Sequence, residues 1–456
     1  MAEQVSHAEM ARQREISASL RDAWQGKRYH IVTYGCQMNA HESEVYAGIL
    51  EEMGMEAAPT RWEADFLLFN TCCIRENAEK RLFGNIGKLR EHKQENRPGL
   101  MIGVCGCVPQ QEGVARRLMR RYPFVDFVMG AQGGHTLPET VQRAMEGRMD
   151  AVVEDERVAE GQPVRRLDPF RAYVNIMYGC DNFCTYCIVP YVRGRERSRA
   201  AGEVIAEVEV LARDGVQEIT LLGQNVNSFS GGMSFAKLLR ELNGAVPRIR
   251  FMTSHPKDIT DDVLDAAAEC GSVAKHIHLP AQSGSDAVLA AMNRGYTREH
   301  YLGIVRRARE RMPGVGISTD IIVGFPGETE DDFLRTLDLM QAARFDSAFT
   351  FAYSARKGTG AATFEGQISE EIKKERLHRL IELQEEIQQE VYRRLVGHCD
   401  TLLVEGPSKK GDGVTGRIGR GIMVNTAQSA QTGSLMPVRI TQPKHKTLYA
   451  EWGEPL

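Results

Sequence analysis

The sequence lacks any apolar run that approaches the roughly 20 residues needed to span a lipid bilayer. Its first 28 residues are polar and charged, without the apolar stretch of a secretory signal. Solenoid repeats and low-complexity tracts are also absent. We therefore expect a cytoplasmic protein with reduced thiols and no membrane partner.

An excess of positive charge is missing as well. The chain has 57 Lys and Arg against 61 Asp and Glu, a formal net charge of −4, which excludes a globally basic nucleic-acid binder but permits local basic patches. Its 456 residues are 42% hydrophobic and 26% charged, the balance of a soluble globular protein. At about 100–200 residues per domain, this length favours three domains.

A fourth cysteine is missing near Cys180, Cys184 and Cys187, which stand together in YGCDNFCTYC. A metal site closed by protein usually takes four ligands, so the missing one is either supplied from elsewhere or left open for a reactant. The spacing lets one loop hold an iron–sulfur cubane with one free iron. The alternative is a zinc knuckle, which more often needs a second cysteine pair or histidines, and none follows closely.

The first third of the chain repeats one pattern three times: an apolar strand, a cysteine-bearing loop, and a helix. The three loops carry Cys36, then Cys72 and Cys73, then Cys105 and Cys107. Parallel α/β sheets gather ligands at the carboxyl ends of their strands. We therefore predict an N-terminal parallel α/β, Rossmann-like domain with cysteines from all three loops on a common rim.

The remaining chain predicts two further folds. Six candidate strands separated by helices lie between about residues 170 and 355 and indicate a partial (βα)6 barrel. After His398, short β-rich runs alternate with turn residues, which is typical of a small antiparallel β-barrel. The predicted divisions are a polar leader (1–27), the Rossmann-like domain (28–145), the partial barrel (165–395) and the small barrel (396–456).

Polar side chains near the ends of the middle strands are candidate ligand contacts. They are Gln224, Asn225, Gln282, Ser283 and Asp320. A barrel of this kind offers its strand ends to a ligand. A structural turn or strand-end hydrogen bond is an equally good interpretation of each. We interpret His255, His276 and His278 as structural rather than as metal ligands.

The cysteine spacing resembles a known superfamily. C-x-x-x-C-x-aromatic-C at the end of the first barrel strand, with Tyr186 as the aromatic residue, looks like the radical S-adenosylmethionine enzymes. The resemblance implies that Cys180, Cys184 and Cys187 hold a [4Fe–4S] cluster. It also implies that S-adenosyl-L-methionine (SAM) binds the open iron, beside Tyr186, and yields a 5′-deoxyadenosyl radical.

The N-terminal motifs narrow the resemblance to the methylthiotransferases and extend it over nearly the whole chain. The segments TYGCQMN, NTCCIRENA and GCVPQ are similar to that family's signature. The similarity implies that Cys36, Cys72 and Cys107 hold a second, auxiliary [4Fe–4S] cluster that carries sulfur. Cys73 and Cys105 are then bystanders, small buried side chains rather than ligands.

The substrate implied by the resemblance is tRNA. Segments such as VPYVRGRERSR and FAYSARKGTGAA look like those of enzymes that methylthiolate C2 of N6-(isopentenyl)adenosine at position 37, next to the anticodon. The alternatives are threonylcarbamoyl-adenosine in tRNA or a ribosomal protein, although enzymes of the last kind carry an acidic residue where Arg356 stands here. A non-catalytic, zinc-containing RNA-binding protein is the alternative of a different class. The resemblance identifies neither the electron donor nor the sulfur donor.

Two groups of basic residues are candidate RNA contacts. The first group is the arginine run of RGRERSR, and the second lies in the small barrel, which resembles a TRAM domain. Cations there would meet phosphates of the anticodon stem-loop, whose unpaired bases are accessible to proteins. A solvated charged face is the competing interpretation. The candidates are Arg193, Arg195, Arg197, Arg199, Lys409, Lys410, Arg417 and Arg420.

Overall fold

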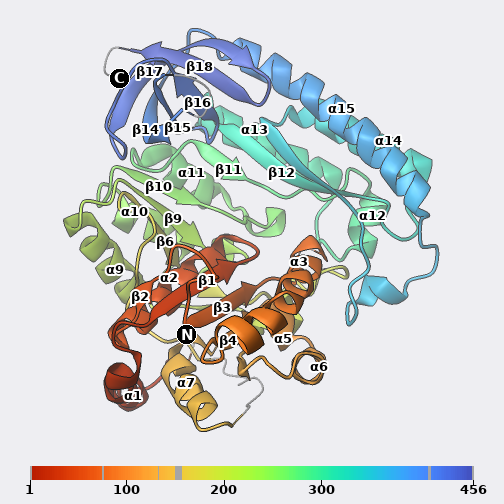
Figure 1. The fold of residues 1–456 in the computed structure, drawn as a ribbon. Coiled ribbons are helices and arrows are strands. Elements are labelled where there is room, and N and C mark those ends of the chain that lie inside the picture. The colour runs from red at the N-terminus through yellow and green to blue at the C-terminus, as the bar shows by residue number, and fades with distance from the viewer. Residues whose placement is uncertain (1–2, 74–75, 132, 149–156, 409–411, 454–456) are drawn as a thin grey trace. The chain divides into compact units, whose positions relative to one another are not determined.

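The computed structural model describes residues 3–73, 76–131, 133–148, 157–408 and 412–453. The chain forms two compact units (Figure 1). The first contains Met1–Leu167, Tyr178–Asp181 and Cys187–Arg199, and the second contains Asp168–Met177, Asn182–Tyr186 and Ala200–Leu456. No helix in the described part of the chain is long and apolar enough to cross a membrane.

A five-stranded parallel sheet forms the centre of the first unit, in the order β2-β1-β3-β4-β5. Its strands are β1 (Arg28–Thr33), β2 (Glu56–Ala57), β3 (Phe66–Thr71), β4 (Met101–Gly106) and β5 (Phe127–Val128). Every residue of β3 and β4 is buried, as expected of central parallel strands covered by helices on both faces. The predicted parallel α/β domain is confirmed.

Helices surround this sheet. They are α1 (His7–Trp24), α2 (Gln37–Glu52), α3 (Glu76–Gly87), α4 (Leu89–Glu91), α5 (Cys107–Gln110), α6 (Val114–Arg121), α7 (Leu137–Met145) and α8 (Val189–Arg193), with short helical turns at His92–Asn96 and Gly134–Thr136. The predicted polar leader forms α1, which contacts α7 and buries Leu20 and Trp24. The Trp24 ring meets Phe66 edge-on, with 5.7 Å between centroids. The leader is therefore part of the first unit's core.

Six parallel strands begin the second unit, as predicted. They are β6 (Arg171–Asn175), β9 (Glu218–Leu222), β10 (Arg248–Phe251), β11 (His276–His278), β12 (Gly316–Val323) and β13 (Ser347–Ala352). They form two three-stranded sheets, β10-β9-β6 and β11-β12-β13. Ile249 joins the two sheets because its backbone bonds to Ser272 and Ala274, just before β11. The result is an open barrel of six βα units.

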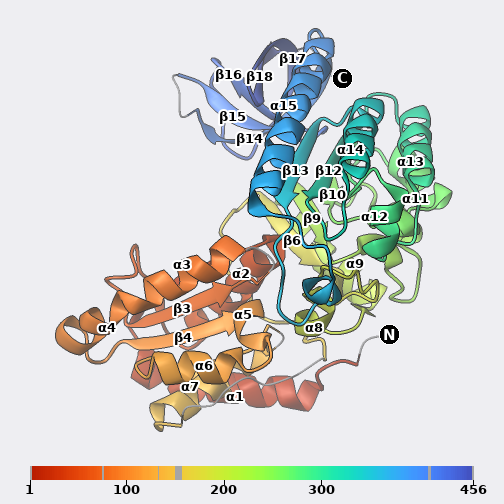
Figure 2. The ribbon, with the colours of Figure 1, turned by 90° about the vertical axis from the view of Figure 1, so that its right-hand side faces the viewer.

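Helices separate these strands. They are α9 (Ala201–Arg213), α10 (Phe235–Leu242), α11 (Asp261–Glu269), α12 (Asp286–Ala291), α13 (Arg298–Arg311), α14 (Glu330–Ala343) and α15 (Glu370–Arg394), with short turns at Val226–Ser228, Pro256–Asp258 and Gly360–Thr363; the short strands β7 (Met177–Tyr178) and β8 (Arg197–Ser198) flank the cysteine loop region. Thr329 and Asp332 form a capping box at the start of α14. Figure 2 shows α13 and α14 side by side along the sheet.

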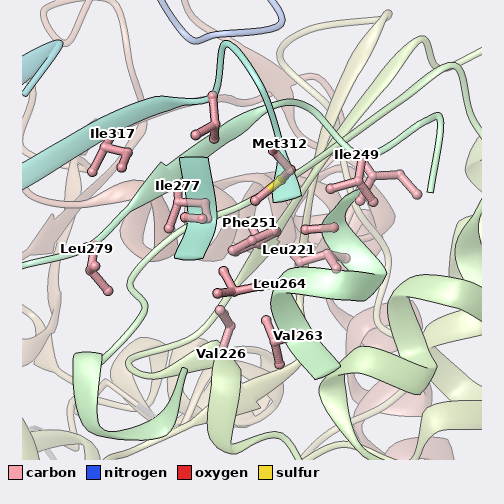
Figure 3. Packing of buried hydrophobic residues seen from close by; sticks show 14 of the residues in the cluster. Leu221, Val226, Ile249, Phe251, Val263, Leu264, Ile277, Leu279, Met312 and Ile317 are labelled. Atoms are coloured by element: carbon pink, nitrogen blue, oxygen red, sulfur yellow. The ribbon is translucent and has the colours of Figure 1, made fainter. Parts of the chain in front are cut away.

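The interior of the second unit is a continuous apolar cluster. Strand side chains such as Leu221, Ile249 and Ile277 meet Leu264 of α11 (Figure 3). Each of these four residues is at most 2% exposed. Burying a side chain of this size stabilises a fold by about 1.5–3 kcal/mol. This packing fixes the strands, and with them the positions of the residues at the strand ends.

The C-terminal residues form a closed five-stranded barrel in the order β14-β15-β16-β18-β17. Its strands are β14 (Cys399–Pro407), β15 (Val414–Ile418), β16 (Met423–Thr426), β17 (Leu435–Lys444) and β18 (Thr447–Trp452). All pairs are antiparallel except β16 with β18. The predicted small β-barrel is confirmed, and this barrel belongs to the second unit.

Candidate active site

Three cysteines of the first unit lie at the carboxyl ends of neighbouring strands. Cys36 follows β1 and caps α2, Cys72 follows β3, and Cys107 follows β4 and begins α5. The Cys72 thiol donates a hydrogen bond to Cys36. A Cβ on Gly35 would lie 2.4 Å from the Cys72 Cβ, so only glycine permits this approach. The topology thus brings the loops together as predicted.

The bystander cysteines Cys73 and Cys105 differ from Cys36 and Cys107 in the direction of their pKa shifts. The pKa of the Cys36 thiol is lowered to about 6, first by the hydrogen bond from Cys72 and then by the Arg193 charge, against the effect of burial. A hydrogen bond from Cys73 and the same arginine lower the Cys107 pKa. The hydrogen bond to Cys107 and burial raise the Cys73 pKa, and burial raises that of Cys105. Thiolates, which bind metals, are therefore favoured at Cys36 and Cys107.

A buried amide pair fixes the loops that carry these thiols. The Asn39 side chain, one turn into α2, donates from Nδ2 to Asn70 Oδ1 at 2.9 Å and to the Thr71 carbonyl at 3.1 Å. Asn70 donates in return to the Asn39 carbonyl and to Ser43 Oγ. Both asparagines are fully buried, so breaking one bond leaves a polar group unpaired at a cost of about 1–3 kcal/mol.

The same thiols satisfy the requirements of an iron–sulfur cluster. In the described part of the chain, no three or more Cys, His, Asp or Glu side chains are grouped as a site for one metal ion. A cubane instead takes each thiolate on a different iron. Three neighbouring loops that converge, with thiolates favoured at two of them, fit such a group.

Arg193 is buried beside these cysteines, although the sequence predicts it as an RNA contact. Its guanidinium donates from Nε to Cys107 Sγ at 3.3 Å and from Nη1 to Glu42 Oε1 at 2.6 Å. Only 3% of its side chain is exposed. The interpretation of Arg193 as an RNA contact stays a prediction, and the enclosure of its guanidinium does not favour contact with a phosphate. The sequence missed Glu42, which lies 151 residues away.

The other predicted RNA contacts divide by exposure. Arg199 pairs with Glu160 and is 7% exposed at its side chain. Arg420 pairs with Asp346 and is 13% exposed at its side chain. Both side chains are enclosed in ion pairs, so their burial does not favour the predicted contact with RNA. Solvent reaches the side chains of Arg195, Arg197 and Arg417. Lys409 and Lys410 lie outside the described residues.

The loop with the three closely spaced cysteines is shared between the units. Cys180 and Cys187 belong to the first and Cys184 to the second. Cys184 is 8% exposed, and Nη1 of the buried Arg294 donates to its Sγ at 3.3 Å. Thr185 follows and is fastened by its backbone N–H to the Met292 carbonyl. The sequence analysis missed Arg294, which lies 110 residues from Cys184 along the chain.

The predicted strand-end ligands of the second unit fall into two groups. Asn225 and Ser283 have structural partners, since Asn225 binds Asp258 and the His255 N–H while Ser283 contacts Thr336. The interpretation of both as strand-end hydrogen bonds is therefore the better one.

The second group has polar atoms that the fold does not use. Within the described residues, Gln282 Oε1, Ser254 Oγ and His255 Nε2 are buried and have no hydrogen-bond partner. They follow β10 and β11, whose ends are joined by the Ser254 N–H and His278 carbonyl. Buried polar atoms are normally paired, so a polar ligand at this rim would satisfy them. These atoms fit a cofactor such as SAM.

The remaining candidates at this rim are half-buried. Gln224 lies two residues after the end of β9. Asp320 on β12 has 29% of its side chain exposed, and its Oδ1 lies 3.6 Å from His278 Nε2. Tyr186 packs against the cluster that contains Met292 and Phe325. His276 and His278 both contact Ser318 Oγ, in agreement with their interpretation as structural residues.

Comparison with known proteins agrees with this arrangement. The radical SAM superfamily matches residues 174–340, and the uncharacterized protein family UPF0004 matches residues 28–130. The chain is 47% identical to a tRNA-2-methylthio-N(6)-dimethylallyladenosine synthase of Alkaliphilus oremlandii, over 98% of each chain. It is 48% identical to the enzyme of that name in Carboxydothermus hydrogenoformans, over 92% of this chain and 97% of the other.

The chain belongs to the tRNA-2-methylthio-N(6)-dimethylallyladenosine synthase family. Membership of this synthase family confirms the expected methylthiotransferase resemblance. Among solved structures, the radical SAM methyltransferase TsrM of Kitasatospora setae matches 74% of each chain with a TM-score of 0.55. At 15% identity that likeness concerns the fold alone.

Proposed function

We propose that the protein transfers a methylthio group to C2 of N6-(isopentenyl)adenosine at position 37 of tRNA, next to the anticodon. Near-full-length identity of 47% with synthases of this name is the observation that carries the proposal. The enzyme uses two [4Fe–4S] clusters and SAM. When bound, these groups supply the electron, the hydrogen-abstracting radical and the methylthio sulfur, chemistry that side chains cannot perform.

The six predicted cysteines are the proposed cluster ligands. Cys180, Cys184 and Cys187 hold the radical SAM cluster, and Cys36, Cys72 and Cys107 hold the auxiliary cluster. For the auxiliary set, support comes from the converging loops and from the lowered thiol pKa values of Cys36 and Cys107. For the radical set, support comes from the spacing and from the buried contact of Cys184 with Arg294.

The strand-end residues of the second unit bind and orient SAM in this proposal. Gln282 accepts a hydrogen bond through its buried, unused Oε1 atom. Tyr186, Gln224 and Asp320 line the same strand ends with half-buried side chains. Tyr186 also packs against a buried apolar cluster. This cluster helps to exclude water, and a reactive radical needs that exclusion.

The exposed basic residues contact the anticodon stem-loop. Arg195 has 65% of its side chain exposed and Arg417 has 44%, so both guanidinium groups are accessible to phosphate. The C-terminal barrel, which resembles a TRAM domain, supplies the second of these. The target base is unpaired in the loop and can be turned out toward the reacting groups. This substrate places the enzyme in the cytoplasm.

The test is anaerobic reconstitution with isopentenylated tRNA, followed by nucleoside analysis for the methylthio product. The wild-type enzyme is expected to form it. Cys184→Ala is expected to abolish SAM cleavage while about half of the iron remains, since the auxiliary cluster still assembles. Cys72→Ala is expected to retain SAM cleavage and lose methylthio transfer.

Three outcomes would each contradict a part of this assignment. Product on threonylcarbamoyl-adenosine or on a ribosomal protein, with none on isopentenylated tRNA, would overturn the substrate. Loss of the second cluster in Cys73→Ala but not in Cys72→Ala would overturn the ligand choice. A colourless protein containing zinc in place of iron and sulfide would overturn the enzyme class.

A further inference from the structure

A buried ion pair contacts the proposed auxiliary cluster site. Arg193 ends α8, and its Nη1 and Nη2 atoms donate to the two carboxylate oxygens of Glu42 at 2.6 and 3.3 Å. The remaining edge of the guanidinium, Nε–H, donates to Cys107 Sγ at 3.3 Å. The side chains are 3% and 12% exposed. Arg193 is thus bound to a carboxylate on one edge and to a sulfur on the other.

Stability alone is a poor reason for this arrangement. A buried ion pair often contributes less than apolar packing would, because both charges lose their hydration. Helix α2, which carries Glu42, offers a comparison through its Glu51. Arg165 donates from Nε to Glu51 at 2.8 Å, and the side chain of Arg165 is 47% exposed. This second pair contains no thiol. Of these two pairs, the Arg193–Glu42 pair alone is buried against a proposed cluster ligand.

Hydrogen bonds and charges next to a cluster's sulfur ligands change its reduction potential. Reduction adds negative charge to the cluster. A cation that donates to a ligand sulfur stabilises the reduced state and raises the potential, whereas a nearby anion lowers it. Arg193 lies directly on Cys107, and Glu42 lies behind it, so the two side chains act with opposite sign.

We propose that Arg193 is a positioning residue that holds the Cys107 thiolate and raises the reduction potential of the auxiliary cluster, while Glu42 orients the guanidinium and moderates its charge. This inference rests on the proposed function, because it takes Cys36, Cys72 and Cys107 as the ligands. Neither residue contacts the reacting base in this assignment. Their effect is carried by the cluster's thiolate.

The test isolates the auxiliary cluster in the full chain. Cys180, Cys184 and Cys187 are changed to Ala, the protein is reconstituted anaerobically, and the potential is measured by redox titration followed by electron paramagnetic resonance. Arg193→Gln is expected to shift the potential to a more negative value at unchanged iron and sulfide content. Glu42→Gln is expected to shift it to a more positive value.

A matched control and a rescue variant separate charge from general disruption. Arg165→Gln breaks the comparison pair on α2 and is expected to leave the potential unchanged. Arg193→Lys keeps the charge but lacks the planar fork, so its shift is expected to be smaller than that of Arg193→Gln. If the ion pair had a merely structural role, Arg193→Gln and Glu42→Gln would not shift the potential in opposite directions.

Each outcome decides the inference. Equal potentials in the parent and in Arg193→Gln, or shifts of one sign in both Arg193→Gln and Glu42→Gln, would overturn it. If Arg193→Gln takes up no iron, the positive shift of Glu42→Gln supports the inference and an unchanged value refutes it. If the wild type forms the methylthio product but the two variants show none of these shifts, the inference is refuted and the proposed function stands. A parent without any cluster would refute the ligand assignment and the inference with it.

Discussion

Ten chemically identical thiols acquire different properties from their surroundings. Cys36 begins α2, and a helix N-terminus favours the thiolate in addition to the hydrogen bond from Cys72. Cys73 is adjacent to Cys72 in sequence, and its hydrogen bond to Cys107, together with burial, raises its pKa. Metal uptake requires deprotonated ligands, so these surroundings favour Cys36 and Cys107 over Cys73 as ligands.

Burial has a comparable effect on His255. It is 7% exposed, and its Nδ1 accepts the Lys257 N–H. Burial, followed by the Arg294 and Lys257 charges, lowers its pKa to about 2. The folded state therefore keeps this histidine neutral while the unfolded state, with a pKa near 6.5, takes up a proton on acidification.

The stability that depends on neutral His255 is complete above about pH 6.5 and falls as the pH drops toward the folded-state pKa. We expect His255 to contribute a slope of about 1.4 kcal/mol per pH unit between about pH 6 and 4. His255→Asn, whose amide oxygen can accept the Lys257 N–H, is expected to reduce the slope by that amount in urea unfolding. His378→Asn, at a side chain 74% exposed, is the control. An unaltered slope in His255→Asn would contradict the assignment.

The arginine run shows where a sequence stops being informative at this scale. The sequence alone predicts one basic patch, formed by Arg193, Arg195, Arg197 and Arg199. In the fold, Arg193 and Arg199 turn inward because Glu42 and Glu160, distant in the sequence, lie beside them. Charge density along a chain predicts a charged face, but burial depends on carboxylates that only the tertiary structure brings near.

At the scale of elements, the strand–loop–helix repeat could be predicted well. The three cysteine loops follow β1, β3 and β4 as expected because each strand is an apolar run that ends at its loop. The helix α1 was missed for the opposite reason. Its buried face contains Gln13 and Ser17 as well as Leu20 and Trp24, so its apolar periodicity is weak.

The loop between β1 and α2 depends on one glycine. Gly35 has φ +133°, and an added Cβ would lie 2.4 Å from the Cys72 Cβ. Gly35→Ala is expected to displace Cys72, so that reconstituted protein contains about half the iron and sulfide of the wild type but still cleaves SAM.

Anaerobic iron and sulfide analysis, with a SAM cleavage assay, checks this loop. Gly202→Ala is the matched control, because Gly202 lies in α9 and an added Cβ there meets nothing within 4 Å. A full iron content in Gly35→Ala would show that the loop tolerates the methyl group.

At the scale of the second unit, two arginines attach the C-terminal barrel. Arg248 donates to the carbonyls of Thr401 and Arg417, and Arg250 donates to those of Ile418 and Gly419. The two guanidinium groups are held together because both pair with the same carboxylate, that of Glu218 on β9. The barrel is therefore bound through its own backbone, which makes this attachment independent of the barrel's side chains.

Arg250→Met keeps an unbranched apolar stem of similar bulk but removes two of these hydrogen bonds and one ion pair of the buried Glu218. Removing one partner of a buried pair costs about 3–5 kcal/mol. We expect faster hydrogen–deuterium exchange of the β15 amides and weaker tRNA binding in this variant. Arg439→Met, an exposed residue of β17, is the control. Exchange rates equal to those of the wild type would mean that the barrel is attached by other contacts.

The two units are interleaved along the chain, because Tyr178–Asp181 and Cys187–Arg199 belong to the first while the residues around them belong to the second. A gene truncated after Leu167 would encode the first unit without α8 and hence without Arg193. A gene that begins at Asp168 would encode the second unit together with Tyr178–Asp181 and Cys187–Arg199, which belong to the first unit. A division of the chain at Leu167 therefore leaves the first unit incomplete, so the two units have to be expressed as one chain.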